Sequence, residues 1–406
     1  MAKEKKTKTK KWIKFRHKVV RALAWVAFLP SIKFKFRAKI DKYKNDKKKR
    51  YLILYNHQTV FDQFFVAFAF SGTIYYVASE DIFSNGIVSK LLRYAVAPIP
   101  IKKQTNDIRA VMTCLKVAKE GGSIAIAPEG NRTYSGKTCY FKPSIVKMAK
   151  ALKLPIAIFR VEDGYGVQPR WADDVRKGGL HAYVKRVIEP EEFLKMSDSE
   201  LHTVIKEELY VDESAPNKEF YHKNLAQYLE RAVYYCPDCG LSVFESDKDL
   251  VKCKKCGKVV RYLPNKQFEG VGFDFKYKNV AEWYEDQSRF MNSLDLDKLP
   301  DEPLYQDDAS VFEVVLYKKK VVIAKMAKII LFPNRIEVEC ESQKFVFDFE
   351  KTEAVTVLGR NKANVYYDGK VYQFKGNERM NALKYVHFFN RYKNTHGGED
   401  DGFLGL

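Results

Sequence analysis

Between residues 51 and about 190, short apolar runs alternate with a segment of helical periodicity. The runs are rich in aliphatic and aromatic residues and predict strands at 51–55, 73–78, 97–101, 123–127, 154–161 and 181–188. Between the third and fourth runs, apolar residues recur at helical spacing at Ile108, Val111, Met112, Leu115 and Ala118, and Gly121 predicts the end of that helix. Alternating strands and helices are typical of an α/β domain with a mainly parallel sheet, which is the fold class we predict for this core.

Two more helices and a β-rich segment follow the core. Ser197 and Glu200 form a Ser-x-x-Glu capping box that predicts a helix start, and another helix is predicted at about 219–233. From residue 311, eight short apolar runs are separated by turns, and a helix is predicted at about 378–392. The pattern predicts a C-terminal antiparallel β domain capped by one helix. Its layout resembles that of pleckstrin-homology (PH) and GRAM domains.

The positive charge is concentrated in an N-terminal arm. Residues 1–50 contain 20 Lys or Arg against three acidic residues, so their net charge is +17, out of +20 for the whole chain. Apolar residues recur among these charges at helical spacing, at Trp12, Phe15, Val19, Ala22 and Val26. We expect an interfacial helix on an anionic membrane surface, because the charge-free run at 22–32 is shorter than the ~20 residues of a spanning helix. The alternative is a solvated basic tail followed by a core helix.

Four cysteines form two Cys-x-x-Cys pairs separated by 13 residues, at Cys236, Cys239, Cys253 and Cys256. This spacing is typical of turns that present four thiolates to a structural zinc ion, so we predict a small zinc ribbon. Disulfides are the alternative. They fit less well because nothing marks the chain as secreted: Arg21 interrupts the apolar stretch that a signal peptide would need.

Polar residues follow two of the predicted strands. Asn56 and His57 come directly after strand 51–55, with Asp62 five residues beyond the histidine, and strand 123–127 leads to Glu129, Gly130, Asn131 and Arg132. Because parallel strands end at a common edge of the sheet, we expect both groups to meet there.

This combination suits acyl transfer to an alcohol. His57 would take the proton of the attacking hydroxyl, and Asp62 would fix the imidazole tautomer. Arg132 would clamp a phosphate, Gly130 would allow close backbone approach, and Glu129 could orient Arg132 or a substrate hydroxyl. A structural His–Asp pair is the alternative.

NHQTVFD resembles the Asn-His-x-x-x-x-Asp motif of the glycerolipid acyltransferases, the 1-acylglycerol-3-phosphate acyltransferase family, and PEGNRT resembles their Pro-Glu-Gly-x-Arg block. The likeness covers residues 50–190. It implies transfer of a fatty acyl group from CoA or acyl carrier protein to a lysophospholipid such as lysophosphatidic acid, with His57 as the base and the 129–132 block binding the acceptor. The middle block of the family resembles VAPIPIKKQ here, which puts Lys103 near an expected phosphate-binding arginine.

The sequence therefore predicts a chain of several units. The expected boundaries are a membrane-surface arm at 1–50, the acyltransferase domain at 51–233, the zinc ribbon at 234–264, a helical linker at 265–308, the PH/GRAM-like domain at 309–395 and a disordered tail at 396–406. We expect the protein at the cytoplasmic face of a membrane, with a protein partner possible through the added units. A nucleic-acid-binding module and a non-catalytic lipid scaffold are the alternative functions. The near-neutral charge of the chain beyond the arm argues against nucleic-acid binding.

Overall fold

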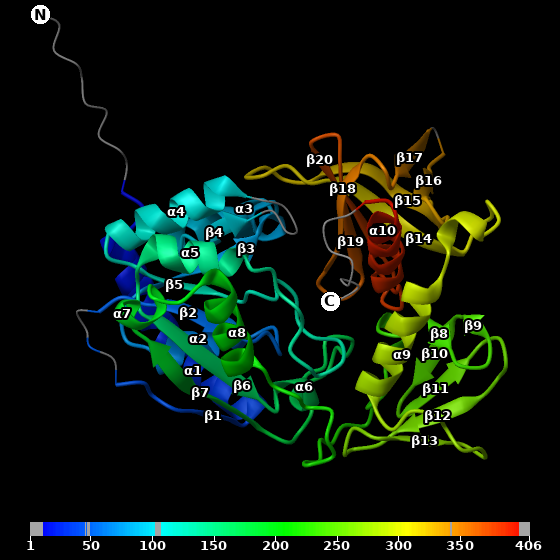
Figure 1. The fold of residues 1–406 in the computed structure, drawn as a ribbon, viewed down its shortest axis with the longest axis horizontal. Coiled ribbons are helices and arrows are strands. Elements are labelled where there is room, and N and C mark those ends of the chain that lie inside the picture. The colour runs from blue at the N-terminus through cyan, green and yellow to red at the C-terminus, as the bar shows by residue number, and fades with distance from the viewer. Residues whose placement is uncertain (1–10, 45, 47–48, 102–106, 342, 398–406) are drawn as a thin grey trace, which may run out of the picture.

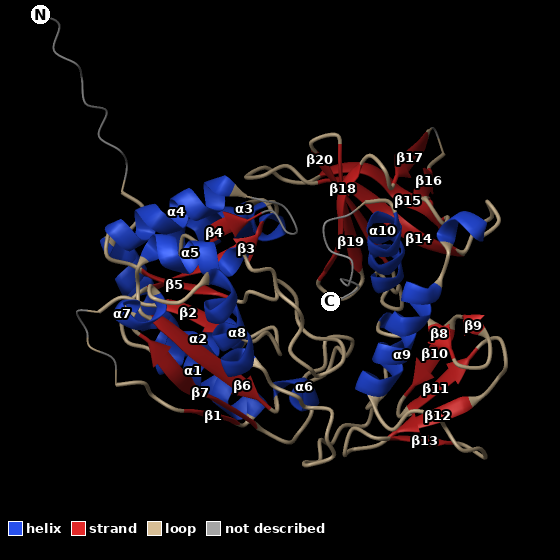
Figure 2. Ribbon diagram, viewed as in Figure 1, coloured by secondary structure: helices blue, strands red, loops and turns tan. Residues whose placement is uncertain are grey.

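The computed structural model describes residues 11–44, 46, 49–101, 107–341 and 343–397. An α/β core lies beside a small cysteine-bearing β unit and a larger antiparallel sheet, as Figure 1 shows by chain position and Figure 2 by type of element. No helix in these ranges is long and apolar enough to cross a membrane.

The core is built on a seven-stranded sheet of order β1-β7-β6-β2-β5-β3-β4. Its pairs are parallel except for β6 with β7, so the prediction of a mainly parallel sheet is confirmed. All four residues of β2 are buried, as expected for a strand with neighbours on both sides. The strands are β1 (Ala38–Ile40), β2 (Leu52–Tyr55), β3 (Ile74–Ser79), β4 (Ile99–Ile101), β5 (Ser123–Ile126), β6 (Ile156–Glu162) and β7 (Leu180–Ile188).

Helices cover both faces of this sheet. Ile53 packs in one apolar cluster with α1 and α2, whereas Leu52 and Leu54 pack in another with α4, α5 and α8, because successive strand residues point to opposite faces. The helices are α1 (Phe15–Phe36), α2 (Asp62–Ala69), α3 (Ile87–Ala95), α4 (Ile108–Lys119), α5 (Ser144–Leu152), α6 (Gly164–Val167), α7 (Pro190–Phe193) and α8 (Asp198–Leu209). The capping box predicted at Ser197 and Glu200 is present at the start of α8.

The basic arm is not separate from the core. Residues 38–40 lie inside the range expected for the arm, yet they form β1 and pair with β7. Ile32 and Phe36 of α1 are buried in the core. The arm joins the core because one apolar face of α1 packs on α2, while apolar side chains on its other face are exposed.

The helix predicted at 219–233 does not form. The segment contains only the 3-10 helix Leu229–Arg231 (η2), and Tyr221 makes a bridge with Lys177. Tyr228 has a φ of 70°, which no α-helical residue adopts, and Phe220 is buried against Gly166 of α6 and Gly178. The apolar residues of this segment are therefore separate anchors and not one helix face.

The cysteine-bearing unit is a small antiparallel sheet followed by a helix. Its strands are β8 (Tyr235–Cys236), β9 (Gly240–Leu241), β10 (Phe244–Asp247), β11 (Leu250–Cys253), β12 (Val259–Tyr262) and β13 (Phe268–Gly270). Because β13 pairs with β12, this sheet extends past residue 264, where we expected the unit to end. The helix α9 (Val280–Ser293) is capped by Asn279 and buries Trp283.

The C-terminal unit is an antiparallel sheet of order β17-β16-β15-β14-β20-β19-β18 with one helix, α10 (Leu383–Thr395). It has seven strands and not the eight expected, because the runs at 321–327 and 328–333 form one long strand paired with β14. The helix begins at Leu383, where Asn381 accepts the amides of Leu383 and Lys384. The strands are β14 (Tyr305–Glu313), β15 (Val321–Leu331), β16 (Arg335–Glu339), β17 (Lys344–Asp348), β18 (Thr352–Leu358), β19 (Lys362–Tyr367) and β20 (Lys370–Gly376).

The added units share a hydrophobic core with part of the α/β core. One cluster joins Tyr134 and Trp171 of the α/β core to Trp283 of α9 and to Phe374 of β20. A second contact is ionic. Asp81, in the 3-10 helix Glu80–Phe83 (η1), is buried between Lys320 and Lys362 of the C-terminal unit and accepts a hydrogen bond from Gln373.

Replacing Asp81 with Asn should loosen this contact. Burial opposes ionisation of Asp81, but the Lys362 and Lys320 ammonium groups outweigh it and hold its pKa below the usual 3.8. The stability gained is therefore present above pH 3.8 and lost as the pH falls through the lowered pKa. We expect Asp81→Asn to lower the unfolding free energy by about 3 kcal/mol at neutral pH, and by progressively less in acid. Thermal unfolding of the full chain measures this, with the exposed Asp308→Asn as control. Equal melting temperatures for the two variants would contradict the prediction.

Candidate active site

A histidine and an aspartate pair at the carboxyl end of β2. The Nδ1 atom of His57 lies 2.8 Å from the Oδ2 atom of Asp62, and the imidazole remains 24% exposed. The chain places them there because β2 ends at Tyr55 and α2 begins at Asp62, so the loop between them turns the aspartate back toward the histidine. With Nδ1 committed to Asp62, the Nε2 atom is the one that can exchange a proton with a substrate.

The Asp62 carboxylate is fully buried and saturated with donors. Besides His57, it accepts the backbone amides of Gln58 at 2.7 Å and Thr59 at 3.0 Å, and the Thr59 hydroxyl at 2.7 Å. These donors replace the water that the carboxylate loses on burial. They also fix the backbone on both sides of the imidazole.

Asn56 and Glu129 make contacts with backbone groups. The Asn56 side-chain amide donates to the Val161 carbonyl at 2.8 Å and accepts the Val161 amide at 2.7 Å, which ties the ends of β2 and β6 together. The Glu129 carboxylate accepts the backbone amides of His57 and Cys139, both at 2.7 Å. These hydrogen bonds hold the loop that carries the histidine, and substrate binding by Asn56 and Glu129 stays a prediction.

Arg132 and Arg170 lie beside the His57–Asp62 pair. Arg132 follows Gly130, whose φ of 67° makes the turn after β5, and the next residue, Thr133, donates its amide to the His57 carbonyl at 3.2 Å. The Arg170 guanidinium donates to the Arg132 carbonyl at 2.8 Å and to the Asn131 side chain at 3.2 Å. Hydrogen bonds from Arg170 and, through Thr133, to His57 thus hold the 129–132 block in place.

Burial shifts two ionisation equilibria in this block. Loss of solvent, together with the nearby Arg170 and Arg360 charges, lowers the pKa of Arg132 to about 9. Burial, with a smaller effect of the Asp62 charge, raises the pKa of Glu129 to about 8, although its two amide donors act in the opposite direction. Such shifts cluster at functional sites, where charged groups are withdrawn from water.

The structure brings together most of the residues that the two strand ends predicted: Asn56, His57, Asp62, Glu129, Gly130, Asn131 and Arg132. Lys103 falls outside the described residues. Sequence reasoning missed Arg170 and the close approach of Gly164, where an added Cβ atom would lie 2.7 Å from the Gln58 side chain. The sequence did contain a signal for these residues, because β6 is a third parallel strand and the polar segment that follows it reaches the same edge of the sheet.

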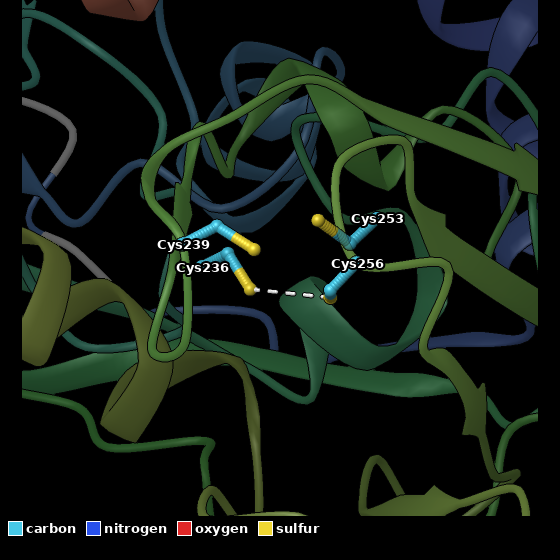
Figure 3. Close-up of side chains that lie close together, drawn as sticks. All are labelled: Cys236, Cys239, Cys253 and Cys256. Atoms are coloured by element: carbon cyan, nitrogen blue, oxygen red, sulfur yellow. Dashed lines mark hydrogen bonds between the residues drawn. The ribbon is translucent and has the colours of Figure 1, made fainter.

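The four cysteines of the paired motif converge from two turns, as Figure 3 shows. Their sulfur atoms all lie within 4.8 Å of one another, and those of Cys236 and Cys256 are 3.9 Å apart. Tetrahedral zinc with Zn–S bonds near 2.3 Å separates its sulfur ligands by ~3.8 Å. The cluster could therefore hold a metal ion.

Apolar side chains are exposed on two neighbouring helices. Phe15 of α1 is 78% exposed, and Ile87 and Leu91 of α3 are 83% and 64% exposed. The helices are in contact, since Arg16 donates to the Tyr94 carbonyl at 2.8 Å. The other end of α1 reaches the active-site loop, where the Phe36 and Phe61 rings are 4.9 Å apart. Phe34, near that end of α1, is 88% exposed, so exposed apolar side chains lie close to both ends of the helix.

Residues 33–161 match the family model described as Acyltransferase. The core is acyltransferase-like. Among solved structures, the chain is similar to PlsC, the 1-acyl-sn-glycerophosphate (LPA) acyltransferase of Thermotoga maritima, with 21% sequence identity and a TM-score of 0.39, covering 47% of this chain and 75% of that one. No curated protein matches the sequence. The family match includes the His57–Asp62 pair and the 129–132 block of the acyltransferase-like core, and it ends before the cysteine cluster.

Proposed function

We propose that this protein is an O-acyltransferase that moves a fatty acyl group from a thioester, acyl-CoA or acyl carrier protein, to the hydroxyl of lysophosphatidic acid, giving phosphatidic acid. The observation that carries the proposal is the pairing of His57 with a buried Asp62 beside Arg132, in a segment that matches the Acyltransferase family. The pair includes no serine, so the acceptor hydroxyl is itself the nucleophile.

The reaction needs one proton transfer in each direction. The Nε2 atom of His57 takes the proton of the acceptor hydroxyl as its oxygen attacks the thioester carbonyl carbon. Collapse of the tetrahedral intermediate breaks the C–S bond, and the imidazolium returns the proton to the departing thiolate. Asp62 stabilises the imidazolium between these steps, because its Oδ2 atom accepts from Nδ1. Arg132 binds the phosphate of the acceptor.

The enzyme works at the cytoplasmic surface of a membrane, where its acceptor and product reside. The exposed apolar faces of α1 and α3 enter the lipid, while neighbouring Lys and Arg side chains contact anionic headgroups. The C-terminal unit is a PH/GRAM-like domain. This assignment is supported by its single antiparallel sheet and the helix that follows it.

Four thiolates hold a structural zinc ion in a ribbon that supports the α9 helix. A zinc ion bound by these cysteines would cross-link the two turns that carry them and would take no part in the transfer. We expect one zinc per chain by elemental analysis, and loss of zinc together with a lower melting temperature in Cys236→Ser and Cys253→Ser. Cys340→Ser is the control and should keep the metal. A purified protein without bound metal whose paired cysteines are disulfide-bonded would contradict the assignment.

The base is tested by acyl transfer from a labelled thioester to lysophosphatidic acid on vesicles. We expect His57→Ala to reduce kcat at least ~10²-fold, the lower end of the range for general-base catalysis, and Asp62→Asn to reduce it because the imidazole loses its fixed tautomer. His181→Ala is a matched control. His181, on β7, pairs with Asp41 at 2.7 Å and is separated from β2 by strand β6, so its loss should leave turnover unchanged. Equal activity of native protein and His57→Ala would refute the assignment.

The membrane surface is tested by vesicle binding. The double variant Ile87→Gln/Leu91→Gln should bind vesicles containing anionic lipid roughly 100-fold more weakly, since two large side chains no longer leave water for lipid, at about 1.5 kcal/mol each. Val243→Gln removes a similarly exposed apolar residue from the cysteine-bearing unit and should bind like the native protein. Co-sedimentation measures both. Identical binding of the two variants would exclude α3 from the surface.

A further inference from the structure

Two buried arginines next to the active site are not paired directly with any carboxylate of the described residues. Arg132 and Arg170 are only 6% and 2% exposed. Their mutual hydrogen bonds end on carbonyl oxygens, and the remaining acceptor is the neutral side chain of Asn131. In the described part of the chain, neither guanidinium forms an ion pair with a carboxylate. Burying a charge without a counter-charge is unfavourable, so this pair of cations indicates a site for an anion.

Both guanidinium groups also have a buried donor without an acceptor. The Nη1 atom of Arg132 and the Nε atom of Arg170 make no hydrogen bond among the described residues. A buried unsatisfied donor costs about 1–3 kcal/mol, which an anionic ligand would recover. Arg231 shows the contrasting arrangement: it is equally buried, but Asp173 lies 2.5 Å from its Nη1 atom.

A third cation comes from the C-terminal unit. Arg360 lies in the turn between β18 and β19, and its guanidinium contacts Asp173, at 3.2 Å from both the side-chain and backbone oxygens. Asp173 is three residues beyond Arg170, so this contact brings the turn to the loop that carries the buried arginine. The Arg360 charge also acts on Arg132, since it contributes to the lowered pKa of that group.

We propose that Arg170 and Arg360 complete, with Arg132, a phosphate-binding site assembled from two units of the chain. The inference rests on the proposed function, in which Arg132 binds the acceptor phosphate, and adds two residues that belong to neither sequence motif. An excess of cations favours a phosphomonoester, which carries two charges above its second pKa of about 6, over a phosphodiester with one. The C-terminal unit is then part of the substrate site.

The connection to the base is short. Thr133, next to Arg132, donates to the His57 carbonyl, and Glu129 accepts the His57 amide. These two hydrogen bonds join the segment that carries Arg132 to the backbone of His57, so a phosphate held by the arginines is placed relative to the imidazole. Movement of the C-terminal unit away from Asp173 would remove one of the three cations.

The test is direct binding of glycerol 3-phosphate to the full-length protein by calorimetry, which requires no turnover. We expect the native protein and His57→Ala to bind alike, Arg170→Gln to bind at least ~10-fold more weakly, and Arg360→Gln several-fold more weakly. Glycerol should not bind detectably. Affinity should rise as the pH increases through about 6, when the phosphate loses its second proton.

Two features keep the result decisive. Arg176→Gln removes another guanidinium that is 2% exposed, which lies between the Trp171 and Tyr262 rings, and should leave affinity unchanged. Arg360 lies on a partly exposed turn, and Asp173 still pairs with Arg231 when Arg360 is replaced. The Arg360→Gln variant should therefore fold even if Arg170→Gln does not. Absence of binding by the native protein, or native affinity in Arg360→Gln, would overturn the proposal. Binding without acyl transfer to any lysophospholipid would instead refute the proposed reaction and leave the anion site standing.

Discussion

The buried carboxylate of Asp62 is the constraint on which the site depends. A charge without access to water is stable only if donors replace its hydration shell, and here the whole 57–59 loop supplies them. One set of hydrogen bonds therefore solvates the carboxylate, orients the imidazole and fixes the backbone after β2. The neighbouring Glu129 and Asn56 extend the same arrangement to β5 and β6. The site is rigid because three parallel strands end together and are joined by side chains that bond to backbone.

The cysteine-bearing unit and the C-terminal unit pack directly on the acyltransferase-like core. Tyr134 of the core stacks with Tyr284 of α9, and one hydrophobic cluster continues into the C-terminal sheet. The polar contacts of Asp81 and Asp173 lie in the loops that follow β3 and β6, two strands whose carboxyl ends lie at the edge of the sheet that carries the candidate site. A unit docked on those loops is well placed to affect what the core binds, and this location makes the two-unit phosphate site physically reasonable.

Local signals in the sequence predicted what depends on local chemistry. The strand ends at His57 and Arg132, the capping box at Ser197 and the proximity of the four cysteines all follow from spacing and residue type. Features set by contacts distant in sequence were missed. The strand β1 forms only because β7 offers a free edge, and Tyr228 leaves the helical region where its neighbours are anchored elsewhere. Arg170 and Arg360 are 190 residues apart in a chain where no motif links them, and only folding brings Arg360 to Asp173, three residues beyond Arg170.

The measurement that tests the central claim most directly is incubation of the protein with labelled acyl-CoA, with and without lysophosphatidic acid, while product and intact protein mass are followed together. A histidine base without a nucleophilic side chain predicts labelled phosphatidic acid only when the acceptor is present, and an unchanged protein mass throughout. An acyl adduct on the protein before the acceptor is added would contradict direct transfer. Absence of product with this acceptor and with other lysophospholipids, from either CoA or acyl carrier protein, would contradict the acyltransferase assignment itself.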